Sequence, residues 1–362
     1  MLRSLVIGCG WAGEGYVNAL RAADVEVALC GRSPEPAQAA ADRLGVAELR
    51  LEWASAIDEL RPDIVVIATP GGSHRVIAEH AAARGCHVIC EKPLGRDADE
   101  AAGMLAAVRS AGVRHAYGAN TRYADVLAQA RELLAAGAIG DLREIEVLDH
   151  FDFPPLMPYS WLYSLAEGGG MLYNVYPHVL AQAQFVSGGR AVWATGLAER
   201  VLDRVPVGAP VHDFRTWAPM TETEAEDAEW RRNDADLAAT VITGIELPDG
   251  RQVHALFHAS AFGAGRHPGY LALYGTEGTL HLLDQPWFSG LQLKRATDDQ
   301  WEDIPVVAVE DRIQSGWNRL VADFVADVAG EGGGSYPTFE DGLLANQLID
   351  QVRAQSVHPS VG

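Results

Sequence analysis

Three glycines near the start of the chain have a spacing that suits phosphate binding. They lie in Gly8-Cys9-Gly10-Trp11-Ala12-Gly13, directly after the apolar run Leu5-Val6-Ile7. In a strand–turn–helix unit the first glycine makes the tight turn, the second admits a pyrophosphate, and the third lets helix and strand pack closely. The helix that follows directs free N–H groups and its positive dipole end at the phosphates. The segment therefore predicts a dinucleotide site formed by Gly8, Gly10, Trp11, Ala12 and Gly13.

The residues expected beside the cofactor's ribose favour a phosphate. The second apolar run, 25–30, is followed by Gly31, Arg32 and Ser33, and no acidic residue is present to accept hydrogen bonds from a 2′-hydroxyl. The Arg32 guanidinium and the Ser33 hydroxyl both suit a 2′-phosphate. Ser33 can also cap the next helix, which Pro34 would begin, and Arg32 can simply be solvated. We therefore expect NADP to be the preferred cofactor and NAD the alternative.

A charged pair follows another buried run. Glu91-Lys92-Pro93 comes directly after 87–90. The carboxyl end of a parallel strand borders the ligand crevice of such sheets. An ammonium there can donate a hydrogen bond to a reacting hydroxyl, and partial desolvation can shift its pKa. Taken alone, however, a lysine at this position is more often a surface charge.

The elements that would hold these residues alternate over the first 120 positions. Apolar runs bounded by turn residues predict strands, and amphipathic helices fill most of the gaps. This alternation predicts a doubly wound parallel sheet, a Rossmann α/β domain over 1–120. The strands are expected at 2–7, 25–30, 63–68, 87–90 and 114–117.

After about residue 120 the pattern changes. A helix at 124–135 is followed by short strand-like runs separated by turn signals. We therefore expect a second, α+β domain over 121–362, with a large, mostly antiparallel open sheet. The strands are expected at 142–149, 191–198, 237–247, 253–260, 270–274, 278–283 and 291–295.

Two parts of the second domain stand apart from its sheet. The stretch 200–233 is rich in Pro, Asp and Glu, and we interpret it as an insertion or lid. Amphipathic helices at 312–328 and 338–352 close the chain and could pack back on the first domain. One face of the open sheet has no covering element that the sequence identifies.

Bulk composition excludes several classes of function. The 362 residues carry a formal net charge of −21, which argues against nucleic acid as a partner. No apolar run reaches the roughly 18 residues that a membrane span needs, and we expect no membrane association. The four cysteines lack zinc-ligand spacing and are expected to be reduced, which fits a cytoplasmic protein.

Taken together, these segments resemble one family along nearly the whole chain. The glycine loop and Glu91-Lys92-Pro93 are similar to those of the Gfo/Idh/MocA oxidoreductases, the group of glucose-fructose oxidoreductase and inositol dehydrogenase. The spacing of these two motifs is the most specific part of the resemblance. The other matching segments are Ala68-Thr69-Pro70 with His74, Asn120-Thr121-Arg122-Tyr123, Gly168-Gly169-Gly170, Tyr274-Gly275-Thr276-Glu277-Gly278 and Tyr336-Pro337-Thr338-Phe339-Glu340-Asp341-Gly342.

The resemblance implies hydride exchange between a nicotinamide and a secondary alcohol or ketone of a sugar or cyclitol. Lys92 corresponds to the lysine that contacts the substrate and the nicotinamide ribose. His178 corresponds to the catalytic acid/base, a role that suits a pKa near working pH. Asn174 stands one helical turn earlier, on the same face. Further cofactor contacts are expected from Thr69, Pro70, His74, Glu91 and Asn120, and substrate contacts from Arg122, Tyr123, Trp161 and Tyr163 as well as Lys92, Asn174 and His178.

Two departures from the family pattern keep alternatives open. Asn174 replaces an aspartate and Tyr176 replaces a glycine. An amide carries no charge, so it cannot raise the pKa of His178 as a carboxylate would. A non-catalytic nucleotide-binding sensor therefore remains an alternative, and His178 could be a core histidine. An enzyme that retains its cofactor for internal redox chemistry, such as isomerisation, elimination or sugar-to-sugar hydride transfer, is another.

Two further expectations concern metals and assembly. His254 and His258 share one face of a predicted strand, but no carboxylate cluster accompanies them, so we expect sheet packing and no metal site. The family resemblance suggests that the open sheet faces pair between subunits. We therefore expect a homodimer or homotetramer.

Overall fold

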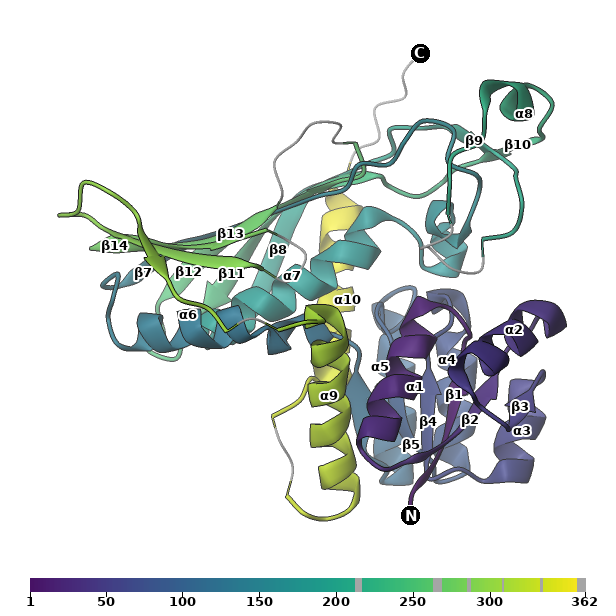
Figure 1. The fold of residues 1–362 in the computed structure, drawn as a ribbon. Helices are drawn as coiled ribbons and strands as arrows, with labels where there is room; N and C mark the ends of the chain where they lie inside the picture. Colours follow the sequence, from purple (N-terminus) through teal and green to yellow (C-terminus); the bar gives the residue numbers. More distant parts are fainter. Residues whose placement is uncertain (212–216, 263–268, 285–287, 308, 333–334, 357–362) are drawn as a thin grey trace.

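The chain forms two sheets with helices packed around them (Figure 1). The structure is a computed structural model, and it describes residues 1–211, 217–262, 269–284, 288–307, 309–332 and 335–356. No helix within these ranges has both the length and the apolar character that a membrane span requires.

The first sheet has six parallel strands in the order β3-β2-β1-β4-β5-β6. This arrangement confirms the expected doubly wound sheet, with its carboxyl-end crevice at the switch point between β1 and β4. Strand β4 is buried at every position because helices cover both faces of the sheet. The two-residue β3 was not predicted, since so short a strand has no readable pattern. The strands are β1 Arg3–Ile7, β2 Glu26–Cys30, β3 Leu49–Arg50, β4 Ile64–Ile67, β5 His87–Cys90 and β6 His115–Tyr117.

Capping residues mark the ends of the helices between these strands. Pro34 occupies the first turn of α2, and the Asp97 side chain caps α5 by accepting a hydrogen bond from the Glu100 N–H. Gly45 and Gly112 end α2 and α5 in the left-handed conformation. The elements are α1 Trp11–Ala22, α2 Pro34–Leu44, α3 Trp53–Leu60, η1 Gly71–Ser73, α4 His74–Ala83 and α5 Ala98–Ala111.

The second sheet has eight strands in the order β16-β15-β14-β13-β7-β12-β11-β8. It is mixed but mostly antiparallel, as expected: β7 pairs in parallel with β12 and antiparallel with β13. The strands are β7 Leu142–His150, β8 Arg190–Glu199, β11 Ala238–Glu246, β12 Gln252–Ser260, β13 Tyr270–Gly275, β14 Gly278–Leu283, β15 Gly290–Arg295 and β16 Glu302–Ile304.

Helices cover one face of this sheet (Figure 1). Alternate residues of β12 are buried beneath them, as the period of a half-covered strand requires. Short 3₁₀ turns connect the two sheets and lead into α7. The elements are η2 Asn120–Tyr123, α6 Asp125–Ala135, η3 Trp161–Tyr163, η4 Leu165–Glu167, α7 Met171–Ser187 and α10 Phe339–Gln355.

The stretch 200–233 projects beyond the second sheet (Figure 1). Strands β9 Arg204–Pro206 and β10 Trp230–Arg232 pair antiparallel, and α8 Glu222–Glu226 carries a capping box. The expected insertion thus has some regular structure of its own, while residues 212–216 lie outside the described chain.

The last long helices return to the first sheet. Helix α9, Arg312–Val328, runs beside α1, and its Trp317 ring lies edge-on to Trp11 with 5.2 Å between centroids. Trp317 lies so close to Gly15 that a Cβ atom there would be 2.2 Å from the ring. A glycine at position 15 is therefore what lets α9 dock against α1.

Candidate functional site

The glycine turn has the geometry of a phosphate site. Gly8 has φ +120°, and a Cβ atom on it would lie 2.3 Å from the Ala68 carbonyl oxygen. A Cβ atom on Gly13 would lie 2.0 Å from the Gly8 carbonyl oxygen, so neither position accepts a side chain. Gly10 is the N-cap of α1 and supplies no side-chain cap, which leaves the first N–H groups of the helix available to an acceptor. These features fit the pyrophosphate of a dinucleotide.

The segment after β2 carries two polar side chains, Arg32 and Ser33, that could bind a ligand. Arg32 is exposed and has no hydrogen bond or ion pair to any residue that the structure describes. Ser33 is the N-cap of α2, yet its hydroxyl makes no capping hydrogen bond. Both groups are therefore available to a ligand at the carboxyl end of the sheet.

His74, which was expected among the cofactor contacts, is buried between two loops. The residue is fully buried, and its ring nitrogens lie 2.8 Å from the Pro93 carbonyl oxygen and 2.7 Å from the Thr69 carbonyl oxygen. Burial lowers the pKa of His74. The side chain connects the loop after β4 to the loop after β5, and so positions Thr69 and Pro70.

Glu91 also positions its neighbours. It is buried, and its two carboxylate oxygens accept hydrogen bonds from the Tyr16 hydroxyl and the Lys92 backbone N–H, both at 3.0 Å. A Cβ atom on Gly118 would lie 2.9 Å from the carboxylate, so a glycine is required there. Burial raises the pKa of Glu91, while the Lys92 charge opposes the shift. The carboxylate thus fixes the turn that carries Lys92.

Lys92 reaches across to the second part of the chain. Its Nζ atom lies 3.2 Å from both the Oδ1 atom and the backbone oxygen of Asn174 on α7. The Asn174 amide group donates in turn to the Gly170 carbonyl at 2.8 Å, which leaves Oδ1 facing the lysine. The peptide bond between Lys92 and Pro93 is cis. Asn174 therefore supplies two acceptors to the ammonium without supplying a charge.

Pro177 inside α7 helps to expose these acceptors. Proline has no N–H, so the Tyr173 carbonyl lacks its helical donor. The next carbonyl, that of Asn174, is the one that accepts from Lys92. The carbonyl that Pro177 frees is therefore the one directly before the carbonyl that accepts from Lys92.

His178 follows Asn174 by one helical turn on the same face. It is half-buried, and its backbone oxygen accepts a hydrogen bond from the Thr121 hydroxyl at 3.2 Å. Burial, assisted by the positive charge of Lys92, holds the pKa of His178 well below its usual range. Burial also lowers the pKa of Lys92, although Glu91 opposes this shift. His178 and Lys92 therefore lie close together beside the carboxyl end of β5, and burial lowers the pKa of both.

Two of the expected substrate contacts point elsewhere. The Tyr123 hydroxyl donates to Asp323 on α9 at 2.9 Å, and burial raises the pKa of Tyr123. The Arg122 guanidinium donates to Ser335 and lies 5.1 Å from the centre of the Phe185 ring. Tyr123 thus meets α9, whereas Arg122 lies between Phe185 of α7 and the segment before α10.

The remaining expected contacts lie near the start of α7. Trp161 is half-buried in η3, beside Gly169, where a Cβ atom would lie 2.4 Å from the Trp161 carbonyl oxygen. Tyr163 is buried and packs its ring against Trp217 and Tyr159. Trp161 thus lies in the turn before α7, whereas Tyr163 belongs to an aromatic cluster. Asn120 is buried, with its amide against Gly316 of α9.

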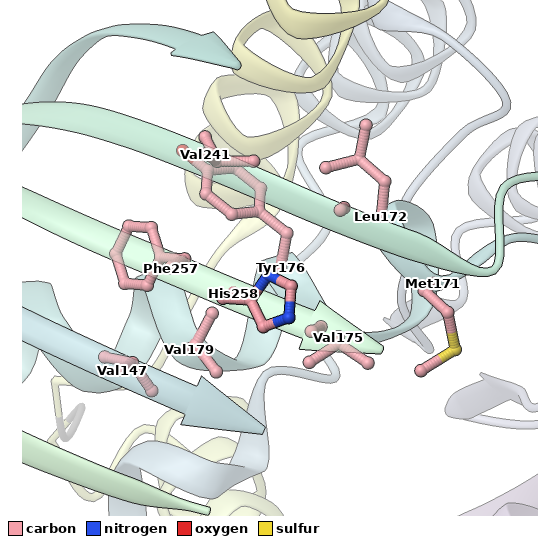
Figure 2. Close-up of a pocket in the computed structure, with 11 residues that line it drawn as sticks. Val147, Met171, Leu172, Val175, Tyr176, Val179, Val241, Phe257 and His258 are labelled. Atoms are coloured by element: carbon pink, nitrogen blue, oxygen red, sulfur yellow. The ribbon is translucent and has the colours of Figure 1, made fainter. Parts of the chain in front are cut away.

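Tyr176 fills the space between α7 and the second sheet (Figure 2). Its ring lies edge-on to Phe257 at 5.4 Å, and its hydroxyl is 2.7 Å from the Thr243 hydroxyl. The cavity that remains there is only about 10 Å³, roughly the space of one water molecule. The departure from the family's glycine is therefore a change in core packing, on a different face of α7 from Asn174 and His178.

The two histidines of β12 have local partners. His258 lies 2.9 Å from the Thr240 hydroxyl, and His254 packs against Trp193. Over the part of the chain that the structure describes, no group of three or more His, Cys, Asp or Glu side chains could hold a metal ion.

Comparison with known proteins identifies the family. Residues 2–119 match the model of an oxidoreductase family with an NAD-binding Rossmann fold, and residues 127–281 match the GFO/IDH/MocA C-terminal domain. The chain belongs to the GFO/IDH/MocA oxidoreductase family. The resemblance seen in the sequence is thereby confirmed, and the first part of the chain is an NAD-binding domain of this family.

Individual relatives agree with this assignment. Levoglucosan dehydrogenase of Pseudarthrobacter phenanthrenivorans is 34% identical over 177 residues, which are 47% of this chain and 45% of that enzyme. The chain thus spans less than half of that relative's length in the match. An oxidoreductase domain protein from Kribbella flavida has a TM-score of 0.82 at 26% identity and covers 98% of this chain and 97% of its own. A levoglucosan dehydrogenase structure in complex with NADH and L-sorbose has a TM-score of 0.82 at 24% identity, with the same coverage of both chains, and shares the fold.

The sequence did not predict the residues that position the site residues through hydrogen bonds. Tyr16 on α1 orients Glu91, and Thr121 on η2 holds the α7 backbone at His178. The helical spacing of α1 predicts that Tyr16 is buried, but no sequence signal names the carboxylate that it meets.

Proposed function

We propose that this protein is a nicotinamide-dependent dehydrogenase that acts on a secondary hydroxyl group of a sugar or cyclitol. The observation that carries the proposal is the grouping of Lys92, Asn174 and His178 beside the ligand crevice of an NAD-binding domain. The curated relative acts on levoglucosan, as its name states, which supports a sugar as the class of substrate.

The two titratable groups suit proton transfer at the substrate hydroxyl. A bound nicotinamide supplies the hydride acceptor at this site. His178, neutral because its pKa is lowered, takes the hydroxyl proton as the carbon–oxygen double bond forms. The Lys92 ammonium donates a hydrogen bond to the same oxygen and stabilises the negative charge that develops on it. In the reverse direction a protonated His178 returns the proton to the carbonyl oxygen.

Asn174 holds Lys92 in place for this reaction. Its two acceptors occupy two of the three N–H donors of the ammonium group and leave one for the substrate. Because the amide is uncharged, it does not raise the pKa of His178 as a carboxylate would. The arrangement therefore favours a neutral base, which is the form that alcohol oxidation needs.

NADP(H) is the proposed preferred cofactor, with NAD(H) as the alternative. Arg32 and Ser33 are available at the end of β2, where no acidic side chain replaces them. A guanidinium and a hydroxyl suit the 2′-phosphate and would leave the 2′-hydroxyl of NAD without its usual carboxylate partner.

Two further parts of the proposal concern the second sheet. The segment 200–233 acts as a lid or wall over the substrate, since it follows the strand that flanks the α7 site. The protein assembles as a homodimer or homotetramer through the sheet face that no helix covers in Figure 1. Partly exposed apolar side chains on β8 and β11 support this: Val192, Leu197 and Ile242.

The experiment that tests this function is a substrate panel. Purified protein is supplied with sugars, cyclitols and their keto forms, each with NAD(H) and with NADP(H). The absorbance of the reduced cofactor is followed. Oxidation of at least one sugar or cyclitol with external cofactor supports the proposal. Cofactor that co-purifies and cycles without exchange would indicate internal redox chemistry instead. Cofactor binding without any turnover would indicate a sensor.

A further inference from the structure

A second cavity, of about 230 Å³, lies on the other side of α7 from the sheet. It is bounded by the exit from β6, by the second half of α7 and by the segment that begins α10. Pro177, Ala181 and Gln184 contribute one wall, and Tyr117 contributes another. It is far larger than the cavity of about 10 Å³ between α7 and the sheet. Neither Asn174 nor Lys92 lines it.

Three arginines line this cavity: Arg122, Arg131 and Arg190. Arg122 and Arg131 place their guanidinium carbons 5.1 and 5.0 Å from the centre of the same ring, Phe185. None of the three has an ion pair with any acidic residue that the structure describes. Arg122 is half-buried, whereas Arg131 and Arg190 are exposed at the rim of the cavity. Close like charges are unfavourable unless an anion compensates them.

The one acidic side chain in the cavity does not compensate them. Asp341 accepts hydrogen bonds from the Thr338 N–H and hydroxyl, as the N3 carboxylate of the α10 capping box. This negative charge lies in the first turn of α10, where the positive end of the helix dipole stabilises it. Three guanidinium groups against this one carboxylate leave the lining of the cavity with an excess of positive charge.

Buried donors in the cavity wall also lack partners. Tyr117 is 2% exposed, and its hydroxyl makes no hydrogen bond to any described residue. The Arg122 Nε–H is likewise buried and without an acceptor. The Gln184 side-chain oxygen accepts from the Ala191 N–H, which leaves its amide N–H groups for another acceptor. A buried hydroxyl and guanidinium N–H without partners each carry a desolvation cost that a bound acceptor would remove.

We propose that this cavity is a binding site for a small organic oxyanion, a phosphate ester or polycarboxylate, separate from the sugar site. The forked guanidinium groups match the oxygens of such a ligand, and the Tyr117 hydroxyl and Gln184 amide supply further donors. A water molecule occupies about 30 Å³ of liquid, so the cavity has room for a ligand of several non-hydrogen atoms. The bound anion would contact the helix that carries Asn174 and His178, one to two turns further along.

Isothermal titration of the cofactor-saturated protein tests this proposal. Saturation with NAD(H) or NADP(H) blocks the pyrophosphate site. Sodium chloride keeps the ionic strength constant. Citrate and inorganic phosphate are titrated separately, and the tighter of the two shows whether carboxylate or phosphate chemistry is preferred. We expect one site per subunit for at least one of them, and Arg131→Gln and Arg190→Gln should each raise its Kd about tenfold or more.

Two further variants locate the site. Arg61→Gln changes an exposed arginine outside the cavity and should leave the Kd unchanged. Tyr117→Phe should raise the Kd several-fold without lowering the stability of the ligand-free protein, since the hydroxyl has no partner to lose. Added sugar substrate should leave citrate or phosphate affinity intact. Absence of binding by both probes, equal Kd values in Arg131→Gln, Arg190→Gln and unmodified protein, or competition with the sugar would overturn the proposal.

Discussion

The Nζ atom of Lys92 lies 3.2 Å from the Oδ1 atom of Asn174, although the two residues are 82 positions apart. Lys92 follows β5 of the first sheet, whereas Asn174 lies on α7, which packs against the second sheet. This contact joins the loop after β5 to the first turns of α7. It places His178 and Lys92 at one site, and the burial that results lowers the pKa of both. The site thus depends on docking between the two parts of the chain.

Restoring a carboxylate at this contact should move the pH dependence of the reaction. In Asn174→Asp, the new negative charge favours the protonated forms of His178 and Lys92 and raises both pKa values. A charge at this range commonly shifts a pKa by about 1–3 units. Because oxidation needs neutral His178, the acid limb of the kcat profile should move to higher pH. An unchanged acid limb would show that another group is the base.

Arg32→Asp should reverse the cofactor preference. In the unmodified protein we expect NADP(H) to bind about tenfold or more tightly than NAD(H), from a charge-assisted phosphate contact. The aspartate would repel the 2′-phosphate and accept hydrogen bonds from the 2′-hydroxyl. Calorimetric Kd values for both cofactors measure this, with Arg61→Asp as the control. Equal binding of NAD and NADP by the unmodified protein would refute the role of Arg32.

Asp149 on β7 should make stability fall as the pH rises. It is 5% exposed, and burial raises its pKa to about 7 from an ordinary value of 3.8. Between about pH 4 and pH 7 the folded state therefore binds more protons than the unfolded state, and stability decreases with pH. Asp149→Asn removes this penalty. Its stability relative to the unmodified protein should rise by on the order of 2–3 kcal/mol between pH 5 and pH 8.

Urea unfolding at the two pH values measures this difference. Asp152→Asn, at an exposed aspartate on the same segment, is the matched control and should show no such change. If the Asp149→Asn and unmodified proteins lose stability in parallel between pH 5 and pH 8, Asp149 is not the buried acid described here.

The uncovered sheet face should mediate assembly. Light scattering is expected to give a multiple of the 38.9 kDa subunit mass. Ile242→Lys introduces a charge on a strand of that face and should shift the protein toward the monomer. Val307→Lys, at a side chain that is 74% exposed outside the sheets, should not. A monomeric mass for the unmodified protein at working concentration would contradict the proposal.

The parallel sheet and the phosphate loop could be predicted because their determinants are local. Short apolar runs, helix caps and three glycines at fixed spacing each act within a few residues. The two-residue β3 could not be predicted, since it exists only by pairing with β2. The structure within 200–233 also escaped prediction, because β9 and β10 are held together by partners more than twenty residues apart.

The site was predicted in part. Lys92, Asn174 and His178 were brought together by family resemblance, since their contacts cross the chain. The partners of the His74 and Arg122 side chains could not be predicted for the same physical reason. The direction of a side chain depends on which helices pack beside it, and neither the Pro93 carbonyl that meets His74 nor the Phe185 ring that meets Arg122 is adjacent in sequence.

The central claim, that Lys92 and His178 together handle the substrate proton, is tested most directly by turnover. With a verified substrate and saturating cofactor, Lys92→Ala and His178→Ala should each lower kcat by roughly 10²–10⁴-fold, the usual contribution of general acid–base catalysis. Cofactor Kd should stay within about an order of magnitude, and the exposed-site control His254→Ala should keep normal kcat. Near-normal turnover in both Lys92→Ala and His178→Ala would contradict the account.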